Sequence, residues 1–143
     1  MCRGAIIGAY DSVRMKRDVL DRLLAEARAN ADIECCGLLA GRGGVISTIL
    51  PAKNALASAK AYEIAPNELF SLFRRMRDEG LEHLGIYHSH PKGDNSPSPR
   101  DIECAFYPET LYVIINPRPD AASPIRAFRI IDGHASEVSL QFF

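Results

Sequence analysis

Residues 88–101 read His-Ser-His-Pro-Lys-Gly-Asp-Asn-Ser-Pro-Ser-Pro-Arg-Asp, and the rest of the chain can be placed around them. The apolar residues Leu84 and Ile86 lead into this stretch and predict a strand over 84–87. Side chains two apart in a strand point to the same face. His88 and His90 are therefore expected to share the face of Leu84 and Ile86, where their imidazoles can converge on one metal ion.

The loop after the two histidines is rich in Gly, Pro and Asn, and it can return Asp101 to them as a third ligand. Zinc binds histidine nitrogen and carboxylate oxygen at about 2.0–2.1 Å. Two His and one carboxylate leave the fourth tetrahedral position open for water, which is typical of catalytic zinc. The pattern thus predicts one zinc ion with a bound water.

Ser98 and Asp101 also have an ordinary structural interpretation. Ser98 fits the N-cap of a helix, Pro99 fits its first position, and Asp101 falls in the acid-favouring first turn. A helix that begins directly after the loop would hold Asp101 in a fixed place. Capping and metal binding therefore remain alternative roles for Asp101.

The motif His-Ser-His-Pro, with seven residues between His90 and Ser98 and two more before Asp101, resembles the signature of JAMM (MPN+) metalloprotease domains. Those domains also carry an upstream Glu-x-Cys-Gly-Leu-Leu-x-Gly segment, which residues 34–41 match. The resemblance implies that His88, His90 and Asp101 bind zinc. It also implies that Glu34 is the general base and that Ser98 helps to stabilise the oxyanion. In similar proteins an Asn lies near position 54, so Asn54 is expected to order the backbone by the site.

Composition places the chain among ordinary globular proteins. It has 143 residues, 47% apolar and 24% charged, with a net charge of −1, which suits a single domain over 1–143. The balanced charge gives no general attraction to nucleic acid or to an anionic membrane. Without an apolar run of roughly 20 residues or a secretory core, we expect a cytoplasmic chain. Reduced cysteines are then the default.

Hydrophobic periodicity predicts two long helices, over 18–30 and 66–79, each with one apolar face. Strands are expected over 3–9, 35–40, 45–50, 111–115, 125–131 and 135–140, with turns at 41–44 and at Asp132-Gly133. Residues 62–64 are expected to be a short extended piece. A short helix from the metal loop to about Phe106 should carry Asp101. The fold class is therefore α/β, a curved mixed sheet with two long helices and one short helix, and the resemblance implies a cytidine-deaminase-like layered fold.

The remaining reactive side chains are assigned structural roles. Cys35 and Cys36 are expected to be small buried hydrophobes, and Cys104 is expected to be a packing residue. His83 lies an odd number of residues from His88, so it should face away as a surface residue. His134 belongs to a hairpin and is not expected to bind metal. Phe142 and Phe143 are expected to be exposed or to pack at an interface, such as that of a homodimer.

The main functional hypothesis is zinc-dependent hydrolysis of a peptide or isopeptide bond. The bare catalytic domain resembles the small prokaryotic JAMM members, some of which trim or release ubiquitin-like sulfur-carrier proteins. The expected partner is therefore a ubiquitin-like or sulfur-carrier protein whose extended Gly-Gly tail adds to an exposed strand edge beside the zinc.

Two alternatives belong to other classes. One is a non-catalytic MPN-type scaffold that keeps zinc for rigidity. The other is a zinc deaminase of related fold, which would need His-x-Glu and Pro-Cys-x-x-Cys ligands. That cysteine pair is absent from the sequence, so the deaminase ranks last.

Overall fold

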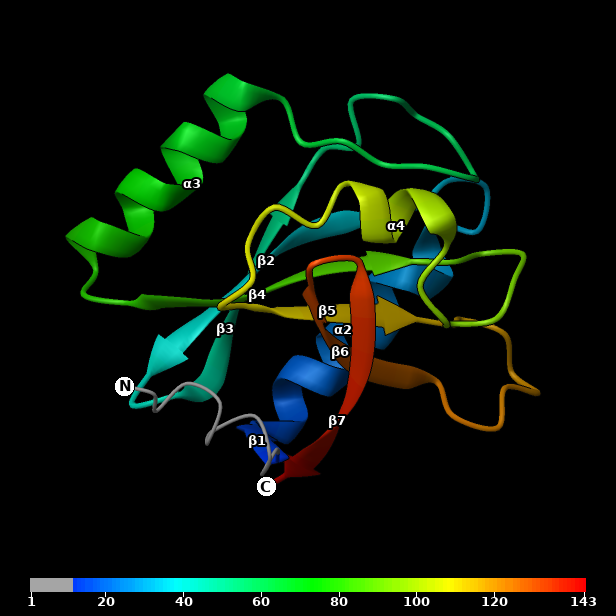
Figure 1. Ribbon diagram of the computed structural model, residues 1–143. Helices are drawn as coiled ribbons and strands as arrows, with labels where there is room; N and C mark the ends of the chain where they lie inside the picture. The colour runs from blue at the N-terminus through cyan, green and yellow to red at the C-terminus, as the bar shows by residue number, and fades with distance from the viewer. Residues whose placement is uncertain (1–11) are drawn as a thin grey trace.

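The computed structural model describes residues 12–143, in which seven strands form one closed ring (Figure 1). Their order is β1-β3-β2-β4-β5-β6-β7, and β1 closes the ring by pairing in parallel with both β3 and β7. The elements are β1 (Ser12–Met15), α2 (Arg17–Ala29), β2 (Cys36–Arg42), β3 (Val45–Ala52), α3 (Pro66–Asp78), β4 (Glu82–Ser89), α4 (Pro99–Glu103), β5 (Leu111–Ile115), β6 (Ile125–Ile131) and β7 (His134–Phe142).

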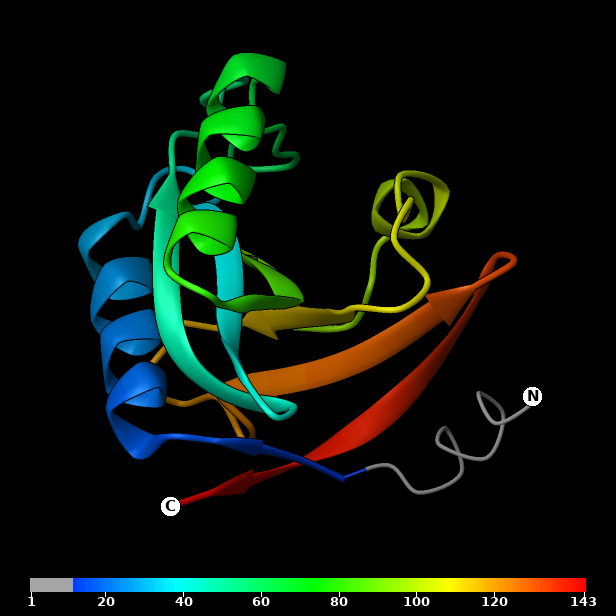
Figure 2. The same cartoon turned by 90° about the vertical axis from the view of Figure 1, so that its left-hand side faces the viewer.

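The central strands β2, β4 and β5 are covered on both faces, which is why their sequences are nearly continuous apolar runs. Alternate residues of each strand enter two different cores. Leu39, Tyr87 and Val113 pack with α2 in one cluster. Leu38 and Ile86 pack with residues of α3 in the other cluster. Figure 2 shows α2 and α3 on opposite sides of β3.

The two long helices confirm the predicted spans to within one residue at each end. Val19, Leu23 and Ala27 form the buried stripe of α2. Leu72 and Met76 are the buried residues of α3. The recurrence at three and four residues places these side chains on one helix face, as the sequence pattern required.

A β-bulge in β4 corrects the predicted facing of two residues. Leu39 pairs with Gly85 but Ala40 pairs with His83, so one extra residue, Leu84, lies between these pairs. The extra residue shifts the alternation along the strand. Leu84 packs in the α2-side core, opposite to Ile86, so the prediction that they share a face was wrong.

The same bulge moves His83 to the face of Ile86, and the prediction of a surface residue was wrong. His83 is half-buried, and its ring packs edge-on against Phe73 and Tyr107. Its Nε2 lies 3.1 Å from the carbonyl oxygen of Gly85. Burial lowers the pKa of His83.

Other sequence predictions fare unevenly. The strand predicted over 3–9 lies outside the described residues, and β1 was not foreseen. The expected curved mixed sheet closes into a ring, which the sequence did not predict, because the short β1 bridges its two edges. The helix α4 ends at Glu103, earlier than the predicted Phe106. Within residues 12–143, no helix is long and apolar enough to cross a membrane.

Candidate metal centre

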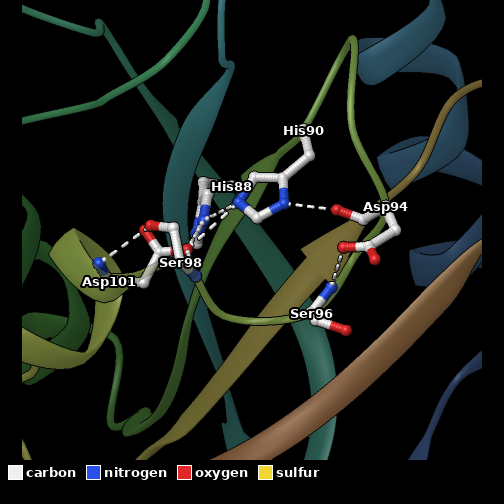
Figure 3. A network of polar contacts seen from close by, with 6 residues as sticks. All are labelled: His88, His90, Asp94, Ser96, Ser98 and Asp101. Atoms are coloured by element: carbon white, nitrogen blue, oxygen red, sulfur yellow. Dashed lines mark hydrogen bonds and ion pairs between the residues drawn. The ribbon is translucent and has the colours of Figure 1, made fainter.

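The predicted site residues come from three separated segments that meet at one end of β4. His88 is the second-last residue of that strand, and His90 follows directly after it. Asp101 lies in the first turn of α4, which Figure 3 shows facing the two imidazoles. Glu34 precedes β2, the strand that pairs Cys36 with His88.

Three ligand-type atoms converge in a small triangle. His88 Nε2 lies 3.1 Å from His90 Nε2. Asp101 Oδ2 lies 3.2 Å from the first nitrogen and 3.1 Å from the second. All three side chains are almost fully shielded from solvent, with 1%, 11% and 8% exposure respectively.

This triangle fits a tetrahedral zinc ion. Zinc–ligand bonds of about 2.0–2.1 Å imply ligand atoms roughly 3.3 Å apart in a tetrahedron, close to the three separations found here. Two imidazole nitrogens and a carboxylate oxygen are also a donor set that zinc accepts. The residues present therefore fit the metal that the sequence predicts.

His90 is oriented by a backbone carbonyl. Its Nδ1 lies 2.6 Å from the Asp94 carbonyl oxygen, as Figure 3 shows. A carbonyl can only accept, so Nδ1 carries the proton, and in the neutral ring the lone pair is on Nε2. Burial lowers the pKa of His90, but hydrogen bonds to Asp101 and Asp94 outweigh it and leave the pKa raised.

Asp101 caps the helix and also faces the two histidines, so its capping role does not exclude the predicted metal-binding role. Its Oδ2 accepts the Ser98 N–H at 2.9 Å while it faces both imidazoles. Ser98 Oγ in turn accepts the Asp101 N–H at 3.1 Å, which completes a capping box. Burial raises the pKa of Asp101, but the hydrogen bonds from His88 and His90 prevail and hold it far below its usual range.

His88 is held differently from His90. It is fully buried, which lowers its pKa. Within the described residues, its Nδ1 has no hydrogen-bond partner. Its ring instead stacks on Tyr62, with centroids 4.5 Å apart and planes inclined by 22°. Sequence reasoning missed this contact, because residues 62–64 carried no signal beyond an extended conformation.

Glu34 is the second acid beside the imidazole pair. It is 3% exposed, and its ligand-type oxygen lies within 4.8 Å of nitrogens of His88 and His90. Burial raises the pKa of Glu34 to about 7, although His90 opposes this shift. Its Oε1 has no protein partner among the described residues, which leaves this oxygen available to a proton donor inside the site.

The backbone around Glu34 is held on both sides. Its N–H donates to the Ser58 carbonyl at 2.8 Å, and its carbonyl accepts the Asn54 side-chain amide at 3.0 Å. The expectation that Asn54 orders this backbone is thereby confirmed. Cys35, next along the chain, donates its N–H to Ser89 Oγ at 2.9 Å and accepts the Ser89 N–H at 3.0 Å. Ser89, which sequence reasoning left unassigned, thus links the segment of Glu34 to the two histidines.

A largely apolar cavity of about 270 Å³ adjoins the site. Asp101, one of the predicted ligands, and its neighbour Arg100 are among the lining residues. The other walls come from the sheet, from α3 and from the segments around them, and they include Leu38, Tyr62, Ile64, Leu69, Ile86, Cys104, Phe106 and Tyr107. Cys104 is exposed at this cavity, so its prediction as a packing residue was wrong.

Comparisons with known proteins agree with this geometry. The model of the family Prok-JAB, prokaryotic homologs of the JAB domain, matches residues 16–131. A probable TtuB-protein conjugate cleaving protease from Thermus thermophilus is 36% identical over 96% of this chain and 89% of its own length. A CysO-cysteine peptidase from Mycobacterium tuberculosis is 31% identical over 86% of each chain.

The solved structure of a JAB1/MPN domain protein from Archaeoglobus fulgidus shares the fold, with a TM-score of 0.62 at 18% identity over 90% of this chain and 98% of that one. The named relatives are proteases or peptidases, which confirms the predicted enzyme class, a hydrolase. The mixed α/β fold class is confirmed as well, and the closure of the sheet into a ring is a detail beyond the prediction.

Proposed function

Because the chain belongs to the family of prokaryotic homologs of the JAB domain, we propose that it is a zinc-dependent peptidase or isopeptidase that cleaves at the C-terminal tail of a ubiquitin-like sulfur-carrier protein. The observation that carries this proposal is the triangle of His88, His90 and Asp101, with the buried Glu34 beside it. The relatives whose names include TtuB-protein conjugates and CysO-cysteine support the substrate class.

His88, His90 and Asp101 would hold the zinc ion. When bound there, zinc would supply Lewis acidity and would lower the pKa of water to about 7. Glu34 is suited to accept the proton of the attacking water, because its buried carboxyl has a pKa of about 7. The same carboxyl can then deliver that proton to the leaving amine.

Ser98 is placed to stabilise negative charge on the substrate carbonyl. Its Oγ accepts the Asp101 N–H, so its hydroxyl proton is still free for another acceptor. A hydroxyl donor that points at the developing oxyanion contributes more in a shielded site than in water. Ser98 therefore serves as the oxyanion helper in this proposal.

The carrier tail needs an extended binding surface. β1 pairs with β3 only at Met15 and Ile46, so within residues 12–143 the stretch of β3 after Ile46 pairs with a strand, β2, on one side alone. A second candidate surface lies beside the cavity. Residues 62–64 are extended outside the sheet and line the cavity next to Asp101. Asn54 and Ala55 bind the Glu63 N–H and carbonyl.

Alternate residues of an extended chain direct their backbone groups to opposite sides. Within the described part of the chain, the backbone groups of Tyr62 and Ile64 form no hydrogen bonds. They are therefore available to pair with a Gly-Gly tail, whose lack of side chains permits close approach.

The experiment compares the purified protein with its Glu34→Gln variant on carrier–peptide and carrier–lysine conjugates, with and without a zinc chelator. We expect the wild type to release the carrier only when metal is present. The variant should keep its zinc and lose roughly 10²–10⁴-fold in turnover, because a general base is missing. Near-normal turnover of the variant would remove Glu34 from the mechanism.

The alternative, a non-catalytic scaffold that keeps zinc for rigidity, predicts a different outcome of the same assay. It would bind stoichiometric zinc and cleave neither type of conjugate. The raised pKa of the buried Glu34 favours the enzyme, because a carboxyl of this kind is typical of proton-transfer sites.

A further inference from the structure

The two histidines of the metal centre differ in what fixes their rings. His90 has a hydrogen bond from Nδ1 to the Asp94 carbonyl. Histidines that bind metal usually have such a partner, which sets the tautomer and the ring orientation. For His88 no such partner exists among the described residues, since its Nδ1 is buried and unpaired.

Rotation of an imidazole about its second side-chain torsion is only weakly restricted by its own bonds. A ring without a hydrogen bond at its distal nitrogen is therefore positioned by the surfaces that contact it. Within residues 12–143, the aromatic rings in contact with His88 are those of His90 and Tyr62. Tyr62 lies nearly parallel to the imidazole, at 22°, and so covers one of its faces.

Tyr62 is itself firmly placed, although it lies outside regular secondary structure. The residues on either side of it are tied to one amide: Asn54 Nδ2 donates to the Ala61 carbonyl at 3.0 Å, and Asn54 Oδ1 accepts the Glu63 N–H at 3.2 Å. The same amide donates to the carbonyl of Glu34. Asn54 therefore fixes the segment of Tyr62 and the segment of Glu34 in one arrangement.

We propose that Tyr62 is a positioning residue for the metal centre. By stacking, Tyr62 holds the imidazole of His88 in the orientation that a hydrogen bond at Nδ1 would otherwise fix. The inference rests on the proposed zinc site. It extends that site to a residue outside the ligand set and outside the motif that predicted the ligands. The aromatic face is what matters, and the hydroxyl of Tyr62 is not needed for this role.

The test measures zinc affinity by competition with a chromophoric chelator for the wild type, Tyr62→Phe, Tyr62→Leu and Phe106→Leu. Phe106 lines the same cavity but is 73% exposed, so its variant alters the cavity without changing the stack on His88. We expect Tyr62→Leu to weaken zinc binding by roughly 10–100-fold, the usual cost of losing a residue that orients a ligand. Tyr62→Phe and Phe106→Leu should bind zinc like the wild type.

A second readout, the state of the His88 ring in the metal-free protein, depends neither on catalytic activity nor on zinc binding. In the metal-free protein, the imidazole nitrogen NMR shifts of His88 should report the same tautomer in the wild type and Tyr62→Phe, and a changed or averaged state in Tyr62→Leu. Equal zinc affinity and equal shifts in Tyr62→Leu would overturn the inference. If metal-free Tyr62→Leu fails to fold, Tyr62→Met replaces it, because Met fills the volume without an aromatic face.

The outcomes also separate this inference from the proposed function. A wild-type chain that binds no zinc would refute the zinc site itself, and the role of Tyr62 with it. A wild type that binds zinc and cleaves conjugates, with Tyr62→Leu equal to it in affinity and NMR shifts, would leave the proposed function intact and refute only the role of Tyr62.

Discussion

Ser98 and Asp101 cap each other at the start of α4, and the Asp101 oxygen that accepts the Ser98 N–H is the oxygen that faces His88 and His90. The metal centre and the helix start are therefore one structure. A substitution at Ser98 or Asp101 therefore affects both the metal centre and the start of α4. The choice of the replacement residue separates the effect on the metal centre from the effect on the helix.

At Asp101, the Asn variant keeps an oxygen that can accept the Ser98 N–H but loses the negative charge. We expect Asp101→Asn to retain α4 and the stability of the metal-free protein. Its zinc affinity should fall by more than about 100-fold, because the loss of a residue that only orients a metal ligand already costs roughly 10–100-fold. Asp101→Ala should also lose the half of the capping box in which the carboxylate accepts the Ser98 N–H, at up to about 1 kcal/mol. Zinc content by elemental analysis and thermal melts of the metal-free variants measure the two effects. Zinc bound by Asp101→Ala as tightly as by the wild type would contradict the assignment of this ligand.

At Ser98, removal of the hydroxyl should reduce kcat more than zinc binding. Ser98→Ala is expected to lose about 10²–10³-fold in kcat, the typical cost of one oxyanion donor. Ser98→Thr keeps both the donor and a good N-cap, so it serves as the control. A Ser98→Ala variant with unchanged kcat and a lowered melting temperature would assign Ser98 to the helix cap alone.

The hydrogen bond between Glu26 and Tyr87, which lies outside the metal centre, is expected to make the stability of the fold depend on pH. The Tyr87 hydroxyl donates to Glu26 Oε1 at 2.6 Å, between α2 and β4. Burial raises the pKa of Glu26, although the hydrogen bond from Tyr87 and the charge of Arg22 oppose the rise. A raised folded-state pKa means that the stability contributed by the protonated carboxyl is complete below the unfolded pKa and is lost as the pH rises through the folded value.

The variant Glu26→Gln accepts the same hydrogen bond without a charge. Its melting temperature relative to the wild type should therefore rise between pH 5 and pH 8, by roughly 1–3 °C. Thermal melts at several pH values in this window check the trend. If the melting temperature of Glu26→Gln minus that of the wild type stays constant or falls with pH, burial does not disfavour the charged form of the Glu26 carboxyl.

The cysteines within residues 12–143 should divide into one accessible and two protected thiols. Burial raises the pKa of Cys35 to about 11 and that of Cys36 to about 12, while Cys104 is exposed. Because the thiolate is the reactive form, iodoacetamide at pH 7.5 should modify Cys104 readily and the other two only in denaturant. Peptide mapping by mass spectrometry distinguishes them, and rapid labelling of Cys36 in the folded protein would contradict its burial.

The sequence was sufficient to predict that these side chains converge, since His88, His90 and Asp101 lie within one short stretch and Glu34 begins a second motif. Periodicity also predicted α2 and α3, because each helix buries a single regular stripe. Contacts between distant segments could not be predicted in this way. The stack of Tyr62 on His88 and the closure of the ring by β1 depend on which segments meet, and neither leaves a local pattern.

The bulge at Leu84 gives the length of β4 a functional meaning. Counting from His83, the side of the strand that His88 faces reflects the one extra residue absorbed on the way. Deletion of Leu84 would make the pairs Ala40–His83 and Leu39–Gly85 consecutive in a regular ladder, and both imidazoles would keep their side. A deletion between Gly85 and His88, where the pairing is already regular, would instead turn the imidazoles toward the α2 core, so the phase of the centre is set by the part of β4 that follows the bulge.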